Sequence, residues 1–461
     1  MHLRYTTPVI ISGAAFFGAL SLLAFYPGLV TYDSIVQYEQ SLSGHYIFYP
    51  PAMALTWGAL NELHPGPILM TSLNLLLYWS CFAVLAVYCV AAAGRWSGAL
   101  SLTAGLFPFL LSFSGVVWTD VLLASSWGLS CSILLMIARS DGRSWAARFG
   151  WCTAATLLVF GDAMRHIAAP AAIVLASALA LHANLRTVAS RVAVFVALAI
   201  PLAVAVPVSD YLVDAGDGWG IEKLMSWDLT GISYFSGQNY RAGGIRPDPI
   251  DNLECYSPRL FDGCELVPFV NRAEATARWG AAVAEQPLSY LKHRALIFSM
   301  LLRAGCDRCS PYSWVDHSDP NPYGFEFKSN SMHRLLGKAQ KILVRSPLGR
   351  PYVWLVAAVG LTAMMWHRRE ITLALISASG VVYTLSYALV APSDEFRYLY
   401  WLFFSVVIVI TAVVFGSTNR FRFRALAMWV VIPVLLAGVT ERLLRYQWPT
   451  DDIAPSMATN Y

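Results

Sequence analysis

The stretch PILMTSLNLLLYWSCFAVLAVYCVAAA, residues 67–93, contains no Asp, Glu, Lys or Arg. A helix of about 20 apolar residues can cross a bilayer, so this stretch predicts a membrane-spanning helix. Other apolar runs that are long enough, or nearly long enough, to cross occur at 9–26, 97–113, 120–137, 149–164, 167–183, 192–208, 351–366, 371–391, 398–416 and 425–440. We therefore expect an all-α polytopic membrane protein with about eleven transmembrane helices.

The composition of the whole chain agrees with this expectation. Of its 461 residues, 57% are hydrophobic and 13% are charged, and the mean hydropathy is +0.53. Soluble domains carry about 25% charged residues. The formal net charge is +4, and the charges form no nucleic-acid-binding pattern. We expect membrane lipids and no nucleic acid among the partners.

The distribution of arginine predicts the orientation, because short cytoplasmic loops are enriched in Lys and Arg. The N-terminus is predicted to be cytoplasmic, which requires that PAMALTWGALNEL (51–63) does not cross. Residues 29–63 then form one outer loop with short amphipathic or re-entrant helices, and the C-terminus is outside. The inner connections contain the acidic Asp141 and Glu370 and the basic Arg4, Arg95, Arg139, Arg143, Arg148, Arg186, Arg191, Arg368, Arg369, Arg420, Arg422 and Arg424.

Residues 209–350 differ from the rest of the chain. They contain 16 Lys and Arg and 16 Asp and Glu, with many Gly, Pro and Tyr and no run long enough to cross. This composition predicts a folded, mainly helical domain on the outer face, between an N-terminal transmembrane module (1–208) and a C-terminal one (351–461). Within it, 271–303 has helical periodicity interrupted at Pro287, so we expect two helices, the second along the membrane surface.

The cysteines divide between the spans and this domain. Thiols inside spans behave as small apolar groups, and those in the spans are Cys81, Cys89, Cys131 and Cys152. An even number on the oxidising side indicates disulfides, with Cys255–Cys264 and Cys306–Cys309 favoured by proximity among three pairings. A redox pair or half of a metal site at CDRC (306–309) is the alternative.

Ionisable residues at membrane depth are costly unless they line a cavity, which makes each a candidate for function. Asp33 follows the first span, and Gln37 and Gln40 recur on its face of the predicted helix. Asp33 could simply cap that helix. A carboxylate in this aromatic, low-dielectric setting is expected to have a raised proton affinity, which suits a general base.

Three more such residues are predicted at the same outer ends of spans. Asp120 begins the fourth span, where a carboxylate also complements the helix dipole. Arg165 and Arg397 have planar guanidinium groups that suit phosphate oxygens. Local ion pairs, Arg165 with Asp162 and Arg397 with Asp394, are the alternative. Because Arg165 and Arg397 are predicted at the same outer side as Asp33 and Asp120, we favour one site that all four residues share.

These residues lie in motifs that resemble those of a known group. The motifs are YPGLVTYDSIVQ with SGHYIFYPP, Trp118 with Asp120, RHIA (165–168) and RYLYW (397–401), together with DLTGIS (228–233) and CYSP (255–258). They are similar to bacterial membrane glycosyltransferases of the GT-C superfamily, related to the glycosyltransferase 39 (protein mannosyltransferase-like) group. Tyr49 stands where that pattern places His, and Ile167 where it often places Asn.

The resemblance implies a GT-C-like fold and transfer of a sugar from a polyprenyl-phosphate donor to a glycan, lipid or protein acceptor, at the periplasmic face of the bacterial inner membrane. For such a transfer, the chemistry of the residues makes Asp33 and Asp120 the catalytic candidates, with Asp33 as the base and Asp120 positioning the acceptor, and Arg165 and Arg397 the ligands of the donor phosphate. Binding of a divalent metal shared by Asp33 and Asp120 is an alternative that the sequence leaves open, and no other cofactor is expected. Further candidates for substrate contacts are Gln37, His45, His166, Asp394 and Tyr398.

Two other functions stay open at the level of sequence. One is a transporter or flippase of lipid-linked sugars; such proteins place polar groups near the bilayer midplane and often contain inverted repeats. The other is a polysaccharide polymerase or ligase that takes an oligosaccharide on a pyrophosphate. The polar residues here gather at one side of the predicted membrane and no repeat is evident, which favours an enzyme working at one face.

Overall fold

The computed structural model describes residues 2–46, 49–140, 144–183, 185, 187–213, 220–241, 248–249, 256–258, 267, 269–305, 314–416 and 422–443. The regular secondary structure of the described residues is helical apart from one antiparallel pair of two-residue strands, β1 (Gln238–Asn239) and β2 (Asp248–Pro249). The helices of the first half are α1 (His2–Phe25), α2 (Tyr32–Ser43), α3 (Ala52–Asn61), α4 (Ile68–Ala93), α5 (Arg95–Leu102), η1 (Thr103–Leu106), α6 (Pro108–Ser114), α7 (Thr119–Ile137), α8 (Trp145–Asp162), α9 (Ala169–His182) and α10 (Val188–Leu212).

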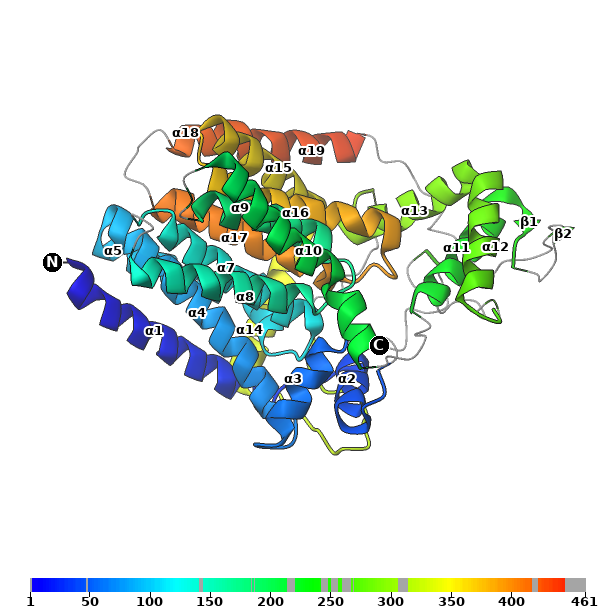
Figure 1. Ribbon diagram of the computed structural model, residues 1–461, viewed down its shortest axis with the longest axis horizontal. Coiled ribbons are helices and arrows are strands. Elements are labelled where there is room, and N and C mark those ends of the chain that lie inside the picture. Colours follow the sequence, from blue (N-terminus) through cyan, green and yellow to red (C-terminus); the bar gives the residue numbers. More distant parts are fainter. Residues whose placement is uncertain are drawn as a thin grey trace.

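The second half continues with helices that belong to two parts of the molecule (Figure 1). Those of the part outside the main bundle are α11 (Gly220–Ser236), α12 (Arg272–Glu285) and the start of α13 (Pro287–Leu302). The break between α12 and α13 falls at Pro287, as the periodicity predicts. The remaining helices are α14 (Ser331–Val344), η3 (Pro347–Gly349), α15 (Pro351–His367), α16 (Ile371–Val390), η4 (Phe396–Leu399), α17 (Tyr400–Phe415), α18 (Arg422–Leu426), η5 (Ala427–Val431) and α19 (Ile432–Leu443).

Seven of the described helices are long and apolar enough to cross a membrane, and an eighth span results if the bent pair 95–106 and 108–114 is one crossing. The pair bends by 61°. The bend lies where Pro108, which has no amide hydrogen, begins α6 after the extended Phe107. By the length and composition of the described helices, the number of membrane spans is therefore seven or eight and not the eleven expected from the sequence. The runs 149–164, 167–183 and 351–366 do form helices, α8, α9 and α15, but α9 and α15 are shorter than a full span.

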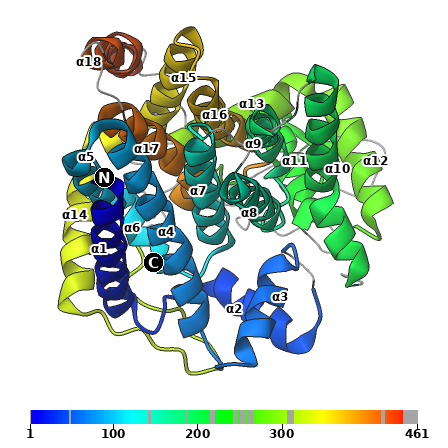
Figure 2. The ribbon, with the colours of Figure 1, turned by 60° about the vertical axis from the view of Figure 1, so that its left-hand side comes forward.

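Burial separates central helices from peripheral ones. The span in α7 is 83% buried and the one that includes α17 is 78% buried, whereas the span in α10 is 11% buried and the span Arg424–Glu441, which runs from α18 through η5 into α19, is 6% buried. α7 packs between α4 and α8, and Figure 2 shows α17 beside α4 and α7. Apolar side chains on the peripheral helices are exposed to the region that lipid would occupy. The bundle thus has a buried helical centre and a perimeter of exposed apolar helices that would face lipid.

One end of the bundle carries the irregular structure. α2 and α3 lie at this end, and α11 and α12 extend beyond it (Figure 1). α1 ends there, α7 begins there, α8 ends there, and the chain passes from α16 to η4 there. This end therefore receives residues from four separate parts of the sequence, and we call it the loop end of the bundle.

Candidate functional site

The start of α2 is held against the segment that leads into α7. The Trp118 indole nitrogen donates to Thr31 Oγ1 at 2.7 Å, and Ser34 Oγ donates to the Val117 carbonyl oxygen at 2.7 Å. Thr31 and Ser34 also form a capping box, which satisfies amide groups at the first turn of α2. Asp33 lies between these two anchored residues, so its position relative to the start of α7 is fixed.

Two backbone connections strengthen this attachment. The Leu29 amide donates to the Gly115 carbonyl at 3.2 Å, and the Val117 amide donates to the Leu29 carbonyl at 2.9 Å. On the other side, the Asp319 carboxylate accepts from the Tyr32 amide at 2.6 Å. The segment that contains Asp319 therefore also holds the start of α2 in place.

Two arginine–carboxylate pairs meet at the loop end. Arg397 Nη1 lies 2.5 Å from Asp33 Oδ2, and Arg397 Nε contacts the Glu395 carboxylate. Arg165 Nη2 lies 3.2 Å from Asp120 Oδ1. Arg165 follows α8, Asp120 is in the first turn of α7, and Arg397 is in η4. The Arg397–Asp33 and Arg165–Asp120 pairs thus each join residues that are far apart in the sequence, whereas Glu395 lies two residues before Arg397.

A shared tyrosine brings the two pairs into one cluster. The guanidinium carbons of Arg165 and Arg397 lie 5.1 Å and 5.4 Å from the centre of the Tyr398 ring. Arg397 also lies 4.6 Å from the Trp118 ring centre, and Arg165 Nη2 donates to the Tyr387 hydroxyl at 3.0 Å. We call Asp33, Asp120, Arg165, Glu395 and Arg397, with these rings, the loop-end cluster.

The local ion pairs considered from the sequence are not the ones found for Arg165 and Arg397. Arg165 pairs with Asp120 rather than with Asp162, whose two carboxylate oxygens are buried with no hydrogen-bond partner. Arg397 pairs with Asp33 and Glu395. The four residues predicted to share a site therefore lie together, because each of the two arginines pairs with an aspartate of another element.

Burial and charge act on Asp33 in opposite directions. Burial by itself raises the pKa of this carboxyl, but the positive charge of Arg397 and a hydrogen bond from Tyr49 outweigh it, and the pKa lies below its usual value. The raised proton affinity expected from the sequence is therefore wrong for Asp33 in this state, because a guanidinium lies against the carboxylate.

Glu395 shows the reverse balance. Its burial, with the nearby Asp33 charge, outweighs the attraction of Arg397, so the pKa of Glu395 is raised. The side chains of Asp33 and Glu395 are 24% and 27% exposed, whereas Asp120 is 2% exposed. The cluster therefore opens outward at Asp33 and Glu395 and is closed behind Asp120.

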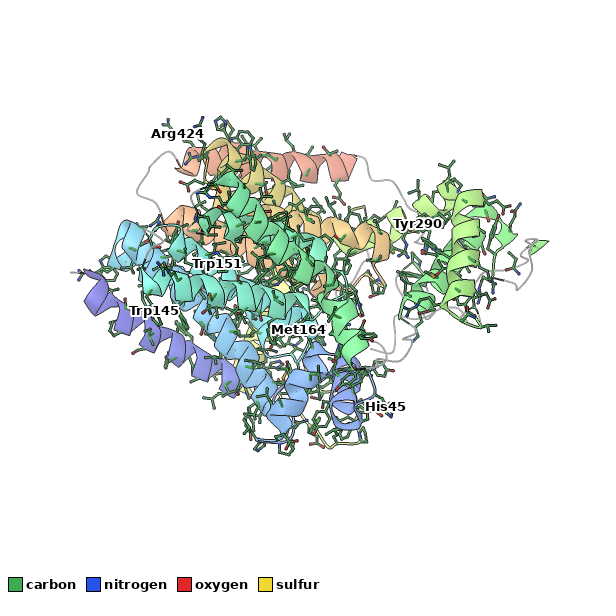
Figure 3. The ribbon with its side chains drawn as sticks, in the orientation of Figure 1. His45, Trp145, Trp151, Met164, Tyr290 and Arg424 are labelled. Carbon is green, nitrogen blue, oxygen red and sulfur yellow. The ribbon has the colours of Figure 1, made fainter. Side chains whose placement is uncertain are left out.

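The other predicted contacts lie at different depths. Gln37, one turn after Asp33, is buried, and its amide oxygen and nitrogen have no hydrogen-bond partner. His166 is exposed and Asp394 is half-buried, while Tyr398 belongs to the cluster. His45 is exposed past the end of α2, away from Met164, the neighbour of Arg165 (Figure 3). The disulfide candidates Cys255, Cys264, Cys306 and Cys309 lie outside the described residues.

Sequence reasoning missed three members of the site. Glu395 could have been found from its position two residues before Arg397. Tyr49, which donates to Asp33, replaces the His of the resembling motif and so marks a polar position. Tyr387 gives no signal in the sequence, because a tyrosine in an apolar run is also typical of a helix near the interface.

The described residues contain no group of three or more His, Cys, Asp or Glu side chains that could hold a metal ion. Asp33 and Asp120, the pair proposed from the sequence to share one, are each engaged by a different arginine. The ligand set present here suits an anion between two guanidinium groups better than a cation between carboxylates.

Comparisons with known proteins give a distant structural match. No family model and no curated protein matches the chain. A solved structure, the archaeal oligosaccharyltransferase AglB from Archaeoglobus fulgidus in complex with an inhibitory peptide and a dolichol-phosphate, matches 95% of this chain with 12% sequence identity and a TM-score of 0.37. The match covers 56% of that structure, so this chain spans about half its length.

Proposed function

We propose that this multi-pass membrane protein is a glycosyltransferase of the GT-C type that transfers a sugar from a polyprenyl-phosphate donor to a glycan, lipid or protein acceptor. The observation that carries the proposal is the loop-end cluster, in which each of two arginines pairs with an aspartate from another part of the chain and both arginines lie over one ring, Tyr398. The motif resemblance supplies the substrate class. The cluster supplies groups for each step of such a transfer.

The two arginines are proposed to bind the donor phosphate. A lipid-linked donor has its phosphate at the membrane surface, and the cluster lies where the apolar helices end. Guanidinium groups bind phosphate oxygens with paired hydrogen bonds. When the bond between the sugar carbon and the phosphate oxygen breaks, negative charge grows on the phosphate, and Arg165 and Arg397 stabilise it as it leaves.

Asp33 is proposed as the general base. It accepts the proton of the acceptor hydroxyl while the hydroxyl oxygen bonds to the sugar carbon, and a single displacement of this kind inverts the configuration there. In the free protein Arg397 holds the proton affinity of Asp33 low. A donor phosphate that binds Arg397 competes with this pairing, so Asp33 becomes a stronger base when the donor is in place.

Asp120 is proposed to position Arg165. It is buried behind the cluster and contacts Arg165 at 3.2 Å, while Tyr387 accepts from the same guanidinium nitrogen. Two partners on one guanidinium group fix its plane. Asp120 therefore acts on the donor through Arg165, and a direct contact with the acceptor is a second role that the sequence left open.

The proposed topology follows from the arginine distribution. The N-terminus is cytoplasmic, the loop end faces the periplasm of a bacterial inner membrane, and the C-terminus lies on that side. In this topology α8, α9 and α15 complete eleven crossings with the seven long helices and the bent pair. Residues 209–350 form the periplasmic domain between the modules 1–208 and 351–461.

A transporter of lipid-linked sugars is less well supported. Its polar groups would lie near the middle of the spans, whereas those described here gather at the loop end. A polymerase or ligase that takes an oligosaccharide on pyrophosphate would use the same arginines. Product size separates it from the proposed monosaccharide transfer.

The test is transfer of radiolabelled sugar from bacterial polyprenyl-phosphate sugars in membranes that contain the protein. Asp33→Asn should abolish the labelled product while the amount of folded protein is unchanged. Glu39→Gln, which removes an exposed carboxylate from the same helix, is the matched control and should keep full transfer. Near-normal transfer by the Asp33→Asn protein would show that Asp33 is not the base.

A further inference from the structure

α14 carries an unusual arrangement of basic side chains. Arg334, Lys338, Lys341 and Arg345 follow one another at intervals of four, three and four residues, which places them along one line on the helix surface. All four are exposed. The sequence contains no Asp or Glu between Glu326 and Glu370, so no acidic residue interrupts this basic stripe.

An apolar stripe lies beside the basic one. Leu335 and Ile342, seven residues apart, are 69% and 71% exposed, and Met332 is also exposed. The opposite face is buried through His333, Gly337 and Gln340. α14 therefore has three faces: one packed on the protein, one basic and one apolar. A basic face next to an exposed apolar face is typical of a helix at a membrane surface.

The position of α14 agrees with such a role. The Asn330 side chain, which caps α14, donates to the Leu23 and Ala24 carbonyls at 2.8 Å and 3.2 Å, at the last turn of α1. α14 then packs on α6 and leads through η3 into α15. On α1, Phe16 and Leu23 are 59% and 61% exposed. The apolar stripe of α14 thus continues the lipid-facing surface of α1 at the loop end.

We propose that α14 is a binding surface for anionic phospholipid headgroups of the leaflet at the loop end. Leu335 and Ile342 enter the acyl region, and the basic stripe contacts the phosphate groups above it. Charge complementarity selects an anionic lipid, since four cations without a nearby acidic residue attract a negative surface. The surface is separate from the loop-end cluster and does not depend on the proposed transfer.

The experiment titrates the purified full-length protein with phosphatidylglycerol or phosphatidylcholine and counts bound lipids by native mass spectrometry. The wild type should bind phosphatidylglycerol more tightly. Lys338→Gln with Lys341→Gln should weaken that binding by about fivefold per charge, about 25-fold for the pair, and leave phosphatidylcholine binding unchanged. Both lysines are exposed, so the substitutions should leave the fold intact.

Two variants serve as controls. Lys338→Arg with Lys341→Arg keeps the charge and should keep the preference. Lys292→Gln with Lys328→Gln removes two exposed charges elsewhere and should also keep it. Equal binding of the two lipids by the wild type, or an unchanged preference in the Lys338→Gln and Lys341→Gln protein, would overturn the proposal. So would a dimer that Leu335→Ser with Ile342→Ser dissociates, because a second copy would then cover α14.

Discussion

Two arginine–carboxylate clusters in the described part of the chain differ in how closed they are. The loop-end cluster has Asp33 and Glu395 about a quarter exposed. The second cluster lies between α11 and α13, where Asp228 contacts Arg294 at 2.7 Å and His293 at 3.3 Å. The side chains of Asp228, His293 and Arg294 are 2%, 0% and 3% exposed. We call these three the closed cluster.

Neighbouring polar groups contact the closed cluster. The Trp279 indole nitrogen donates to Asp228 Oδ2 at 2.8 Å, and the Tyr256 hydroxyl lies 2.8 Å from His293 Nδ1. Arg294 reaches back to the bundle and donates to the Ala391 carbonyl at 3.1 Å, a few residues before Glu395. The same pair of residue types thus occurs once in a partly exposed cluster, which we propose binds substrate, and once in a buried cluster that links two parts of the molecule.

The largest expected effect separates the two arginines. Arg397→Gln should reduce transfer by about 1,000-fold or more, because one of the two groups that stabilise the leaving phosphate is lost. Arg294→Gln should reduce transfer only in proportion to the loss of folded protein. Labelled-product formation per folded molecule measures both. Equal losses per folded molecule would mean that the two clusters do not differ in function.

For the free energy of unfolding, substitution in the closed cluster should have the larger effect and substitution in the loop-end cluster the smaller one. Arg294→Gln leaves Asp228 buried without its cation, which is expected to cost about 3–5 kcal/mol. Asp33→Asn should reduce the free energy of unfolding far less, because Asp33 is partly exposed and Arg397 retains its ion pair with Glu395. Thermal unfolding in detergent, followed by tryptophan fluorescence, compares the two proteins. A larger loss for Asp33→Asn would contradict the distinction.

Acid should destabilise the closed cluster through His293. Burial outweighs the attraction of Asp228 and, with the nearby Arg294 charge, lowers the pKa of His293. The unfolded chain takes up a proton near pH 6.5 and the folded one does not. Stability is therefore fully present above pH 6.5 and falls as the pH drops toward the lowered pKa, by up to about 1.4 kcal/mol per pH unit.

The slope of melting temperature against pH measures this effect. His293→Gln should lower the melting temperature and reduce the slope below pH 6.5. His317→Gln, at a histidine that is 70% exposed, should leave the slope as it is. An unchanged slope in the His293→Gln protein would exclude His293 as its source.

The smallest expected effect concerns Tyr49, which contacts Asp33 of the loop-end cluster. Tyr49 donates to Asp33 and helps to lower the pKa of that carboxyl. Tyr49→Phe removes the donor, so the pKa of Asp33 should rise and the acid limb of the pH–rate profile should move to higher pH. Transfer at neutral pH should fall by about tenfold or less. A limb that stays in place would show that Asp33 does not control it.

The sequence predicts much of the fold because apolar length is a strong signal. Each of the predicted runs is helical, and the run 425–440 is divided among α18, η5 and α19. The count of full spans is harder to predict, since α9 and α15 are too short on their own and Pro108 divides another run. Tertiary packing, which the pattern of apolar residues does not encode, decides whether such helices cross.

The site is predictable in its location and not in its pairing. Successive spans alternate in direction, so Asp33, Asp120, Arg165 and Arg397 can be placed at one end from the sequence. Which arginine contacts which aspartate depends on side-chain positions fixed by Trp118 and Tyr398. Gly231 in DLTGIS is explained only by the structure: a Cβ there would lie 2.1 Å from His293 Nδ1.

The most direct test of the central claim is a cryo-electron microscopy structure of the full-length protein with a polyprenyl phosphate bound. The account predicts that the phosphate lies within hydrogen-bonding distance of both Arg165 and Arg397, with Asp33 released from Arg397. A phosphate bound elsewhere, with the Asp33–Arg397 and Asp120–Arg165 pairs unchanged, would contradict the claim that these residues form a donor site.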